Sequence, residues 1–410
     1  MLDILKNVPL PDASPGSGHS YQGRELFFEF YWYLTENCSY HMLSLLDVAN
    51  PEWRLAERNP YFVVPVDTIQ TVKDTPGLLK SVRFRASKRR TIKHRLKNMS
   101  ESERAAFDSQ ARDFTTPLDL TNYSVESKAK ILDATMDFLD YKYAEEILMN
   151  NSTPSQWKRK FLIARSKVPL KSKEVVMPFP AKEQPQLGHR SRRVAIGGGS
   201  AGLNDDFALI EYRFTLHDLL DNPTGHNKDA WMEMGNFKFR YHPKVERRGN
   251  SSMLRFDDFS LFHVLSLSPI EPYFSTMTWT ARIGARVVKD KGCDFCFVPL
   301  MKIGSGYSQD FKWLVYYFMV ATEAEVSKDI SSKGYRLGVG PDGGIIIRFH
   351  DRFQAFLRGE YLRRFFSSHK WTYEYSGTLR FQMFENNSIE AAYTRFEREG
   401  EALVRYLYYF

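Results

Sequence analysis

The sequence predicts an α+β protein, with a mostly helical N-terminal part, a linker and a C-terminal antiparallel β-barrel of about twelve strands. Three observations predict this class. Apolar residues recur with a helical period from about residue 24 to residue 165, and they alternate with a period of two from about residue 189 onward. The stretch between these two parts is rich in Pro, Lys and Ser. With 410 residues, 43% of them hydrophobic, the chain can form two domains.

The composition narrows the functional classes. Lys and Arg exceed Asp and Glu by only 57 to 49, so nucleic acid is not expected as a partner. Three cysteines are too few for a disulfide scaffold. The longest apolar run, Trp313 to Ala321, is far shorter than the roughly 18 residues that a membrane-spanning helix needs. Aromatic residues make up 15% of the chain, which favours β-structure or a membrane interface.

Helical signals define the N-terminal part, which we place at residues 1–165. Ser100-Glu-Ser-Glu103 has the spacing of a capping box and predicts a helix that continues through Phe114. A second helix is predicted between Glu126 and Met149, with an apolar stripe on one side and charged residues elsewhere. The stripe holds Ile131, Thr135, Phe138 and Leu139, and the charged residues are Lys128, Asp133, Asp137 and Lys142.

A basic run and a proline-rich stretch complete this half of the chain. The run holds Lys88, Arg89, Arg90, Lys93, Arg95 and Lys97. It either contacts phosphates or anionic headgroups or forms a solvated helix face, and the solvated face is the commoner case. Residues 166–187 contain four prolines and predict a linker.

Residues 188–410 alternate between apolar and charged positions, as in Ile210, Glu211, Tyr212 and Arg213. Both a soluble antiparallel sandwich and a membrane barrel give this pattern. The last strand favours the barrel, because its apolar side ends on an aromatic carboxyl-terminal residue, as in the targeting strand of bacterial outer-membrane proteins. This side holds Ala402, Val404, Tyr406, Tyr408 and Phe410, and Arg405 lies on the other side. We therefore expect a barrel in the outer membrane, closed by pairing of the last strand with the first.

Cys38 is the strongest candidate for a catalytic residue. Asn37 before it is a good N-cap, and the apolar residues that follow predict a helix beginning at Cys38. The free amides and the dipole of such a helix start favour a thiolate, the form that acts as a nucleophile. The alternative is a buried structural cysteine. His41 lies one turn further along and is interpreted as a neighbour rather than the base, because papain-like sites take their base from a separate strand.

Two other motifs are weaker. Cys293-Asp-Phe-Cys296 has the spacing of a metal or redox pair, but further ligands are not patterned nearby, so zinc is not expected. A disulfide there requires a turn or bulge, because residues three apart in a strand point to opposite faces. The glycine-rich stretch from Ile196 to Gly202 lacks the remainder of a phosphate-binding loop and is interpreted as a hairpin turn. We expect neither a cofactor nor a metal.

Two stretches of the sequence resemble a bacterial family. Residues about 24 to 97 resemble the Lnb N-terminal periplasmic domain, through Glu36-Asn-Cys-Ser-Tyr-His41, Pro65-Val-Asp-Thr68 and Pro76-Gly-Leu78. Residues about 188 to 410 resemble the β-domain that follows it in proteobacterial members. The strings that carry this second resemblance are Gly188-His189, His217-Asp-Leu-Leu-Asp221, Ser266-Leu-Ser-Pro269 and Trp279.

The resemblance implies a circularly permuted papain-like thiol acyltransferase, periplasmic and joined to an outer-membrane barrel. Members from Bacteroides-type bacteria are taken to N-acylate lipoproteins with an acyl chain from phospholipid. By analogy, Cys38 would attack the phospholipid ester, hold a thioester and pass the acyl group to the amine of a lipoprotein. Phospholipid and lipoprotein are thus the substrates that the resemblance implies.

One departure from the family concerns the base. The family takes it from a histidine in a Gly-His strand well before the cysteine, whereas here only His19 precedes Cys38, and it stands close by in a loop-like setting. We therefore expect that an upstream segment with the signal peptide and the catalytic histidine precedes Met1, and that the chain without it is inactive. The alternatives are a catalytically inactive outer-membrane barrel or scaffold, and a papain-like cell-wall peptidase.

Overall fold

The computed structural model describes residues 37–59, 63–149, 152–172, 175–201, 205–243, 254–274, 276–290, 293–367, 369–397 and 399–410. The chain divides into two compact units, Met1–Thr68 and Ile69–Phe410. The described part of the first unit is helical, and the second contains a helical bundle and a β-barrel. No helix in the described part of the chain is long and apolar enough to cross a membrane.

The described part of the first unit begins with helix α1 (Cys38–Ala49) and the short 3₁₀ helices η2 (Pro51–Trp53) and η3 (Ala56–Arg58), and it ends within α2 (Pro65–Lys73). The Asp47 carboxylate accepts hydrogen bonds from the backbone amides of Leu55 and Ala56, at 2.7 and 2.9 Å, and so fixes the chain after α1. Leu43 of α1 and Leu55 are buried, which anchors the helix by one face.

Five helices form the bundle: α3 (Lys88–Lys97), α4 (Glu101–Arg112), α5 (Val125–Lys142), α6 (Ala144–Leu148) and α7 (Thr153–Ser166). The predicted capping box is present, with Ser100 and Glu103 each bonded to the other's backbone amide. The apolar stripe predicted between Glu126 and Met149 is buried on α5, which ends at Lys142 before the short α6 begins.

The burial of Asp133 differs from the sequence prediction, which placed this side chain away from the buried stripe of its helix. It is only 7% exposed, and its carboxylate accepts a hydrogen bond from Nε of Arg165 on α7 at 2.8 Å. A buried carboxylate is stable only when it is paired, and its partner lies 32 residues away, so helical periodicity could not reveal the pairing.

A segment from the barrel completes the core of the bundle. Phe274 lies in the connection between two strands and is buried with Phe107 and Phe138, while Tyr273 packs edge-on against both of these rings. The Tyr273 hydroxyl donates to the Asp108 carboxylate and accepts from Arg104 Nε. The bundle therefore includes a segment distant in sequence.

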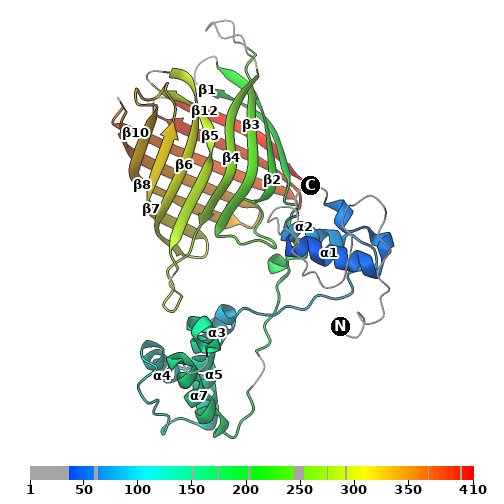
Figure 1. Ribbon diagram of the computed structural model, residues 1–410, viewed down its shortest axis with the longest axis vertical. Helices are drawn as coiled ribbons and strands as arrows, with labels where there is room; N and C mark the ends of the chain where they lie inside the picture. Colours follow the sequence, from blue (N-terminus) through cyan, green and yellow to red (C-terminus); the bar gives the residue numbers. More distant parts are fainter. Residues whose placement is uncertain are drawn as a thin grey trace, which may run out of the picture. The chain divides into compact units, whose positions relative to one another are not determined.

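Residues 166–187, predicted as a linker, contain in their described part the 3₁₀ helices η4 (Ala181–Glu183) and η5 (Pro185–Leu187). The barrel follows, and Figure 1 shows its strands as a closed sheet. The strands are β1 (Arg193–Ala201), β2 (Asp206–His217), β3 (Ala230–Tyr241), β4 (Leu254–Ser266), β5 (Thr278–Asp290), β6 (Cys293–Asp310), β7 (Leu314–Val326), β8 (Tyr335–His350), β9 (Phe353–Phe365), β10 (Trp371–Phe384), β11 (Asn387–Phe396) and β12 (Glu399–Tyr409).

Each strand pairs antiparallel with the next, and β1 pairs with β12, so the sheet has no open edge. The predicted α+β class and the twelve-strand barrel are confirmed. We call the rim at which β1 begins and β12 ends the terminal rim. Because the strand number is even, both ends of the barrel segment lie at this rim, and so does the turn between β2 and β3.

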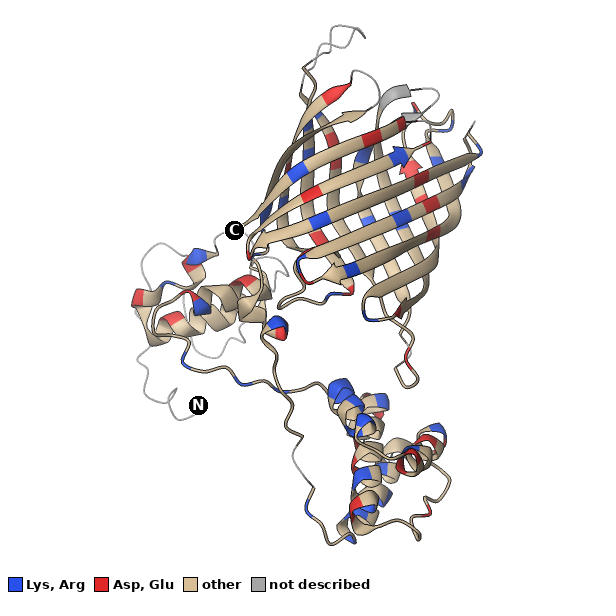
Figure 2. Ribbon diagram, turned by 180° about the vertical axis from the view of Figure 1, so that it is seen from behind, with Lys and Arg blue, Asp and Glu red and all other residues tan. Residues whose placement is uncertain are grey.

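The two faces of β12 are arranged as the alternation predicted. Val404, Tyr406, Tyr408 and Phe410 are 57%, 38%, 47% and 43% exposed and point outward. Arg405 points inward, where it bonds to Glu390 of β11 and Glu211 of β2. Figure 2 shows charged residues recurring singly along the strands between uncharged ones. The apolar outer wall and charged lumen are therefore properties of the strand pattern itself.

The glycine-rich stretch was wrongly predicted as a hairpin turn, because β1 extends through it to Ala201. A Cβ atom at Gly197 would clash with the carbonyl oxygen of Val404, and one at Gly199 with that of Ala402. The glycines therefore permit the close approach of β1 to β12 that closes the barrel. The other weak motif contains a disulfide-bonded residue, Cys296, beside an irregularity in the β5–β6 pairing.

Candidate functional site

Cys38 is the first residue of α1, and its thiol is free and exposed. Asn37 is the N-cap, and its side-chain oxygen accepts from the amides of Ser39 and Tyr40 at 3.0 and 3.3 Å. The Asn37 amide group donates to the carbonyl oxygen of Val63, which leaves Asn37 only 5% exposed. Asn37 thus fixes the start of the helix, while the thiol next to it stays accessible.

The exposed face of α1 next to the thiol is apolar. Met42, Leu45 and Val48 are 55%, 43% and 52% exposed. Met42 and Leu45 stand four and seven residues after Cys38, so they share its side of the helix. A thiol at the end of an apolar strip is suited to a substrate with a hydrocarbon part.

His41 follows Cys38 by one turn, and its ring packs edge-on against Tyr40, with 5.7 Å between ring centroids. In the described part of the first unit it is the single histidine. The other histidine considered from the sequence, His19, lies outside the described residues. The assignment of a base to Cys38 therefore remains a prediction.

The barrel lumen contains a second candidate site, which sequence reasoning did not identify. Asp218 and Asp221, in the turn after β2, are both buried. Their carboxylates bond to three buried guanidinium groups, those of Arg193, Arg213 and Arg380. Burial disfavours the charged carboxylates, but these cations outweigh it and hold the pKa of both aspartates below its usual range. The turn is therefore bound to strands on both sides of the barrel seam.

Between the two aspartates, Leu219 and Leu220 reach into the lumen. They form an apolar cluster with side chains near the terminal rim from β4, β7, β8 and β9. These are Leu265, Val315, Tyr317, Met319, Ile346 and Phe356, together with Leu267 just after β4. The segment from Asp218 to Asp221 thus fills the lumen at this rim, and we call it the plug turn.

Three histidine rings lie beside the plug turn. The rings of His189 and His226 are 4.3 Å apart and those of His226 and His217 are 4.9 Å apart, and His189 Nε2 lies 3.9 Å from the Asp221 carboxylate. Burial lowers the pKa of His189 to about 4 and that of His226 to about 3. Both are therefore neutral at pH 7.

Beyond the plug turn, side chains of opposite charge line the lumen. Lys302 and Arg358 pair with Asp342 at 2.7 Å each, and Arg286 pairs with Glu323 at 2.9 Å. A cavity of about 330 Å³ lies among such pairs, and Leu219 and Leu220 are part of its lining. Because the paired charges neutralise one another, they offer little free charge to a ligand, and removing one partner would leave a buried charge unpaired.

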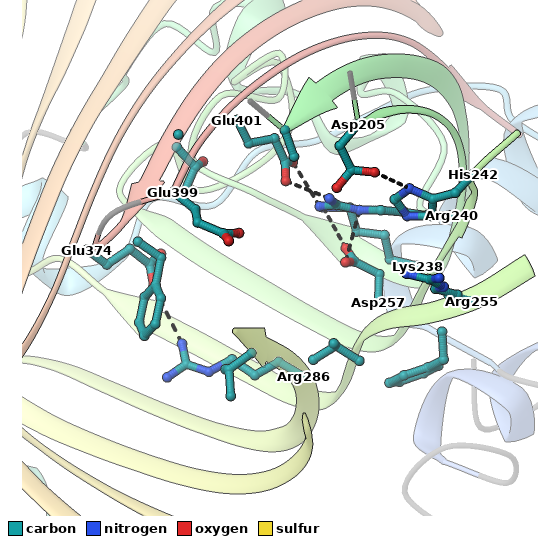
Figure 3. A pocket seen from close by; sticks show the side chains of 17 residues that line it. Asp205, Lys238, Arg240, His242, Arg255, Asp257, Arg286, Glu374, Glu399 and Glu401 are labelled. Atoms are coloured by element: carbon teal, nitrogen blue, oxygen red, sulfur yellow. Dashed lines mark hydrogen bonds and ion pairs between the residues drawn. The ribbon is translucent and has the colours of Figure 1, made fainter. Parts of the chain in front are cut away.

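A further cavity of about 310 Å³ lies at the opposite rim, and Figure 3 shows its side chains. Arg240 is held between Glu401 and Asp257, and His242 contacts Asp205 at 3.0 Å. The signal for these residues was present in the sequence as charged positions alternating along the strands. Their partners were hidden, because alternation within one strand does not say which residue of another strand lies opposite: Arg240 of β3 pairs with Asp257 of the next strand and with Glu401 of β12.

A closed barrel of an even number of antiparallel strands, apolar outside and charged inside, is the architecture of bacterial outer-membrane proteins. The fold therefore defines the class: an integral outer-membrane protein.

Residues 182–409, more than half of the chain, match the model of a family described as a domain of unknown function, DUF7840, and the chain belongs to this family. Residues 82–176 match a second domain of unknown function, DUF7842, and residues 27–75 match the Lnb N-terminal periplasmic domain. A comparison with curated proteins found no match. The barrel lies in the outer membrane, with a periplasmic N-terminal domain, and the resemblance to the Lnb family is confirmed.

Several solved structures are similar to this chain. An outer membrane channel from Pseudomonas putida F1 is 9% identical, with 58% of this chain and 100% of that chain covered and a TM-score of 0.35. A KdgM porin is 11% identical, with 53% and 99% covered and a TM-score of 0.28. Outer membrane phospholipase A from Escherichia coli is 8% identical, with 53% and 90% covered and a TM-score of 0.29. At these values the likenesses carry no functional argument.

Proposed function

We propose that this envelope protein is a thiol acyltransferase that uses Cys38 as its nucleophile. The observation that carries the proposal is the free, exposed thiol at the capped start of α1, within the segment that matches the Lnb domain. The positive end of the helix dipole at this position can stabilise the oxyanion that forms when the Cys38 sulfur attacks a carbonyl.

The proposed donor is a phospholipid, and the proposed acceptor is the amino group of a lipoprotein. The thiol loses its proton and the thiolate attacks the ester carbonyl. A thioester forms, the ester C–O bond breaks, and the lysophospholipid leaves with the proton that the thiol lost. The amine then attacks the thioester, an amide forms, and the thiol is regenerated with the proton lost by the amine. The apolar strip of Met42 and Leu45 supports a donor with acyl chains.

The test uses the protein purified from its outer membrane and mixed with a phospholipid labelled in its acyl chains and a diacylated cysteine peptide. The expected products are lysophospholipid and N-acylated peptide, and both disappear in Cys38→Ser. Cys296→Ser is a poor control because Cys296 is disulfide-bonded, so Ser39→Ala, next to the thiol, serves instead.

Three other outcomes would overturn the proposal. Unchanged product formation by Cys38→Ser would exclude a nucleophilic role for this thiol. If the wild-type protein left phospholipid intact but cleaved cell-wall peptides in a Cys38-dependent way, it would be a peptidase. Absence of both activities would favour an inactive barrel or scaffold, a role with which the ion-paired lumen is compatible.

A further inference from the structure

Two helices of the bundle, α3 and α7, are rich in cations but differ in how those cations are used. On α3 the cations pair with carboxylates of the chain. Lys88 bonds to Asp137, and Arg89 and Lys93 both pair with Glu271. Arg90 and Arg95 have carboxylate partners as well. The basic run on α3 therefore stabilises the bundle, and its charges are largely neutralised.

Helix α7 has no carboxylate of its own. Lys158 and Arg165 pair across the bundle with Asp140 and Asp133, at 2.7 and 2.8 Å. The remaining cations of this segment, Arg159, Lys160 and Lys167, are exposed, and no carboxylate among the described residues forms an ion pair with them. Of the nearby acidic residues, Glu145 and Glu146 lie on α6, which packs against α7.

The same outer face of α7 exposes large apolar side chains. Leu162 and Ile163 are 50% and 49% exposed, while the preceding residue, Phe161, is buried in the core. Ile163 stands four residues after Arg159 and four before Lys167, so the three lie along one side of the helix. Cations flanking half-exposed aliphatic residues are the pattern of a helix that lies on a membrane surface.

We propose that the outer face of α7 binds the surface of a membrane that contains anionic phospholipid. Leu162 and Ile163 enter the boundary between headgroups and acyl chains, and Arg159, Lys160 and Lys167 contact lipid phosphates. Charge complementarity favours an anionic lipid surface, because these cations have no carboxylate partner among the described residues and flank half-exposed aliphatic side chains. The contact is separate from the thiol chemistry and holds whether or not Cys38 is catalytic.

The fold brings α7 within reach of a membrane surface. The barrel holds the chain in the outer membrane, and Phe274, in the bundle core, lies in the connection from β4 to β5 at the terminal rim. Because the periplasmic domain precedes β1, this rim is the periplasmic one. The membrane surface at this rim is therefore the one that α7 meets.

The experiment uses the full chain with Cys38→Ala and a single new thiol, Ile163→Cys, labelled with an environment-sensitive fluorophore. The protein is reconstituted into phosphatidylcholine vesicles, with or without about equal phosphatidylglycerol. The emission of the label should shift to the blue and be quenched by brominated acyl chains when phosphatidylglycerol is present, and raised salt should reverse both effects. A label at Glu126→Cys, in the first turn of α5, should report water in both membranes.

Reversing two cations, as Arg159→Glu and Lys160→Glu, tests the charge contribution. The equilibrium constant for binding of the α7 face to the membrane should fall by at least about fivefold for each cation lost, while circular dichroism shows an intact bundle. The reversal of Lys128 on α5, as Lys128→Glu, is the matched control and should leave docking unchanged. Equal emission from the Ile163 site in both membranes, insensitive to salt and to charge reversal, would overturn the proposal.

Discussion

Arg380 of β10 donates to the carboxylate of Asp218 in the plug turn at 2.7 Å, and both side chains are buried. The two residues are 162 positions apart in the sequence. Arg380 also bonds to Asp221 and to Glu390 of the neighbouring strand, so one guanidinium joins the plug turn to the barrel wall. This group, with Arg193 and Arg213, therefore holds the plug turn in place.

Removing this guanidinium should loosen the plug turn. In Arg380→Met, the carboxylates of Asp218 and Asp221 lose a buried partner, which costs about 3–5 kcal/mol for a buried pair. Hydrogen exchange of residues 218–221 should accelerate strongly. Arg380→Lys, which keeps the charge, should give a smaller increase. Unaltered protection in Arg380→Met would show that Arg193 and Arg213 suffice to hold the turn.

The stability of the plug turn should also depend on pH. The pKa of His189 is about 4 and that of His226 about 3, both below the reference value of about 6.5 that each regains when the turn opens to water. As the pH falls, the two histidines are therefore protonated in the open state before they are protonated in the closed state. Stability is complete above pH 6.5 and falls by about 1.4 kcal/mol per pH unit for each histidine as the pH drops toward 4.

Hydrogen exchange of residues 218–229 between pH 7.5 and 4.5, corrected for the intrinsic rate, measures this slope. Asp221, with its lowered pKa, stays ionised over the range and adds nothing. His189→Gln should reduce the slope by about one proton's contribution. A slope of zero in the wild type would mean that the histidines stay neutral or solvated in both states.

The outward position of Tyr406 predicts a cost for placing charge there. Tyr406→Arg puts a cation toward lipid and should destabilise the barrel by about 2–4 kcal/mol near the midplane, and by less toward the headgroups. Tyr406→Phe is the control at the same site. The measurement is urea-induced unfolding in lipid vesicles. A cost equal to that of the phenylalanine variant would contradict the assigned face.

Closure of the barrel should depend on Gly197. Gly197→Val places a side chain against the carbonyl oxygen of Val404 and the backbone of Arg405, so β1 cannot pair with β12 without shifting. We expect little folded barrel, as judged by heat-modifiable migration on gels. Gly359, at which an added Cβ meets nothing within 4 Å, is the control, and Gly359→Ala should fold normally. Normal assembly of Gly197→Val would contradict the steric role of glycine in the seam.

The sequence alone determined the architecture, because amphipathic periodicity acts locally and lipid demands a closed sheet. The period of two, the terminal Phe410 and the face of Arg405 predicted a twelve-strand barrel with the correct sides. Likewise, the Ser100–Glu103 spacing and the Asn37 cap involve neighbours in the chain, so local pattern sufficed for them.

Only the tertiary structure decided which charges meet. Asp133 with Arg165, and Asp218 with Arg380, are joined by packing between elements distant in the chain, for which periodicity carries no information. The glycines of β1 were mistaken for a turn because a steric need for close approach to β12 arises only when the seam closes. The same limit hid the difference between α3 and α7, since whether a cation is neutralised depends on the carboxylate that folding brings to it.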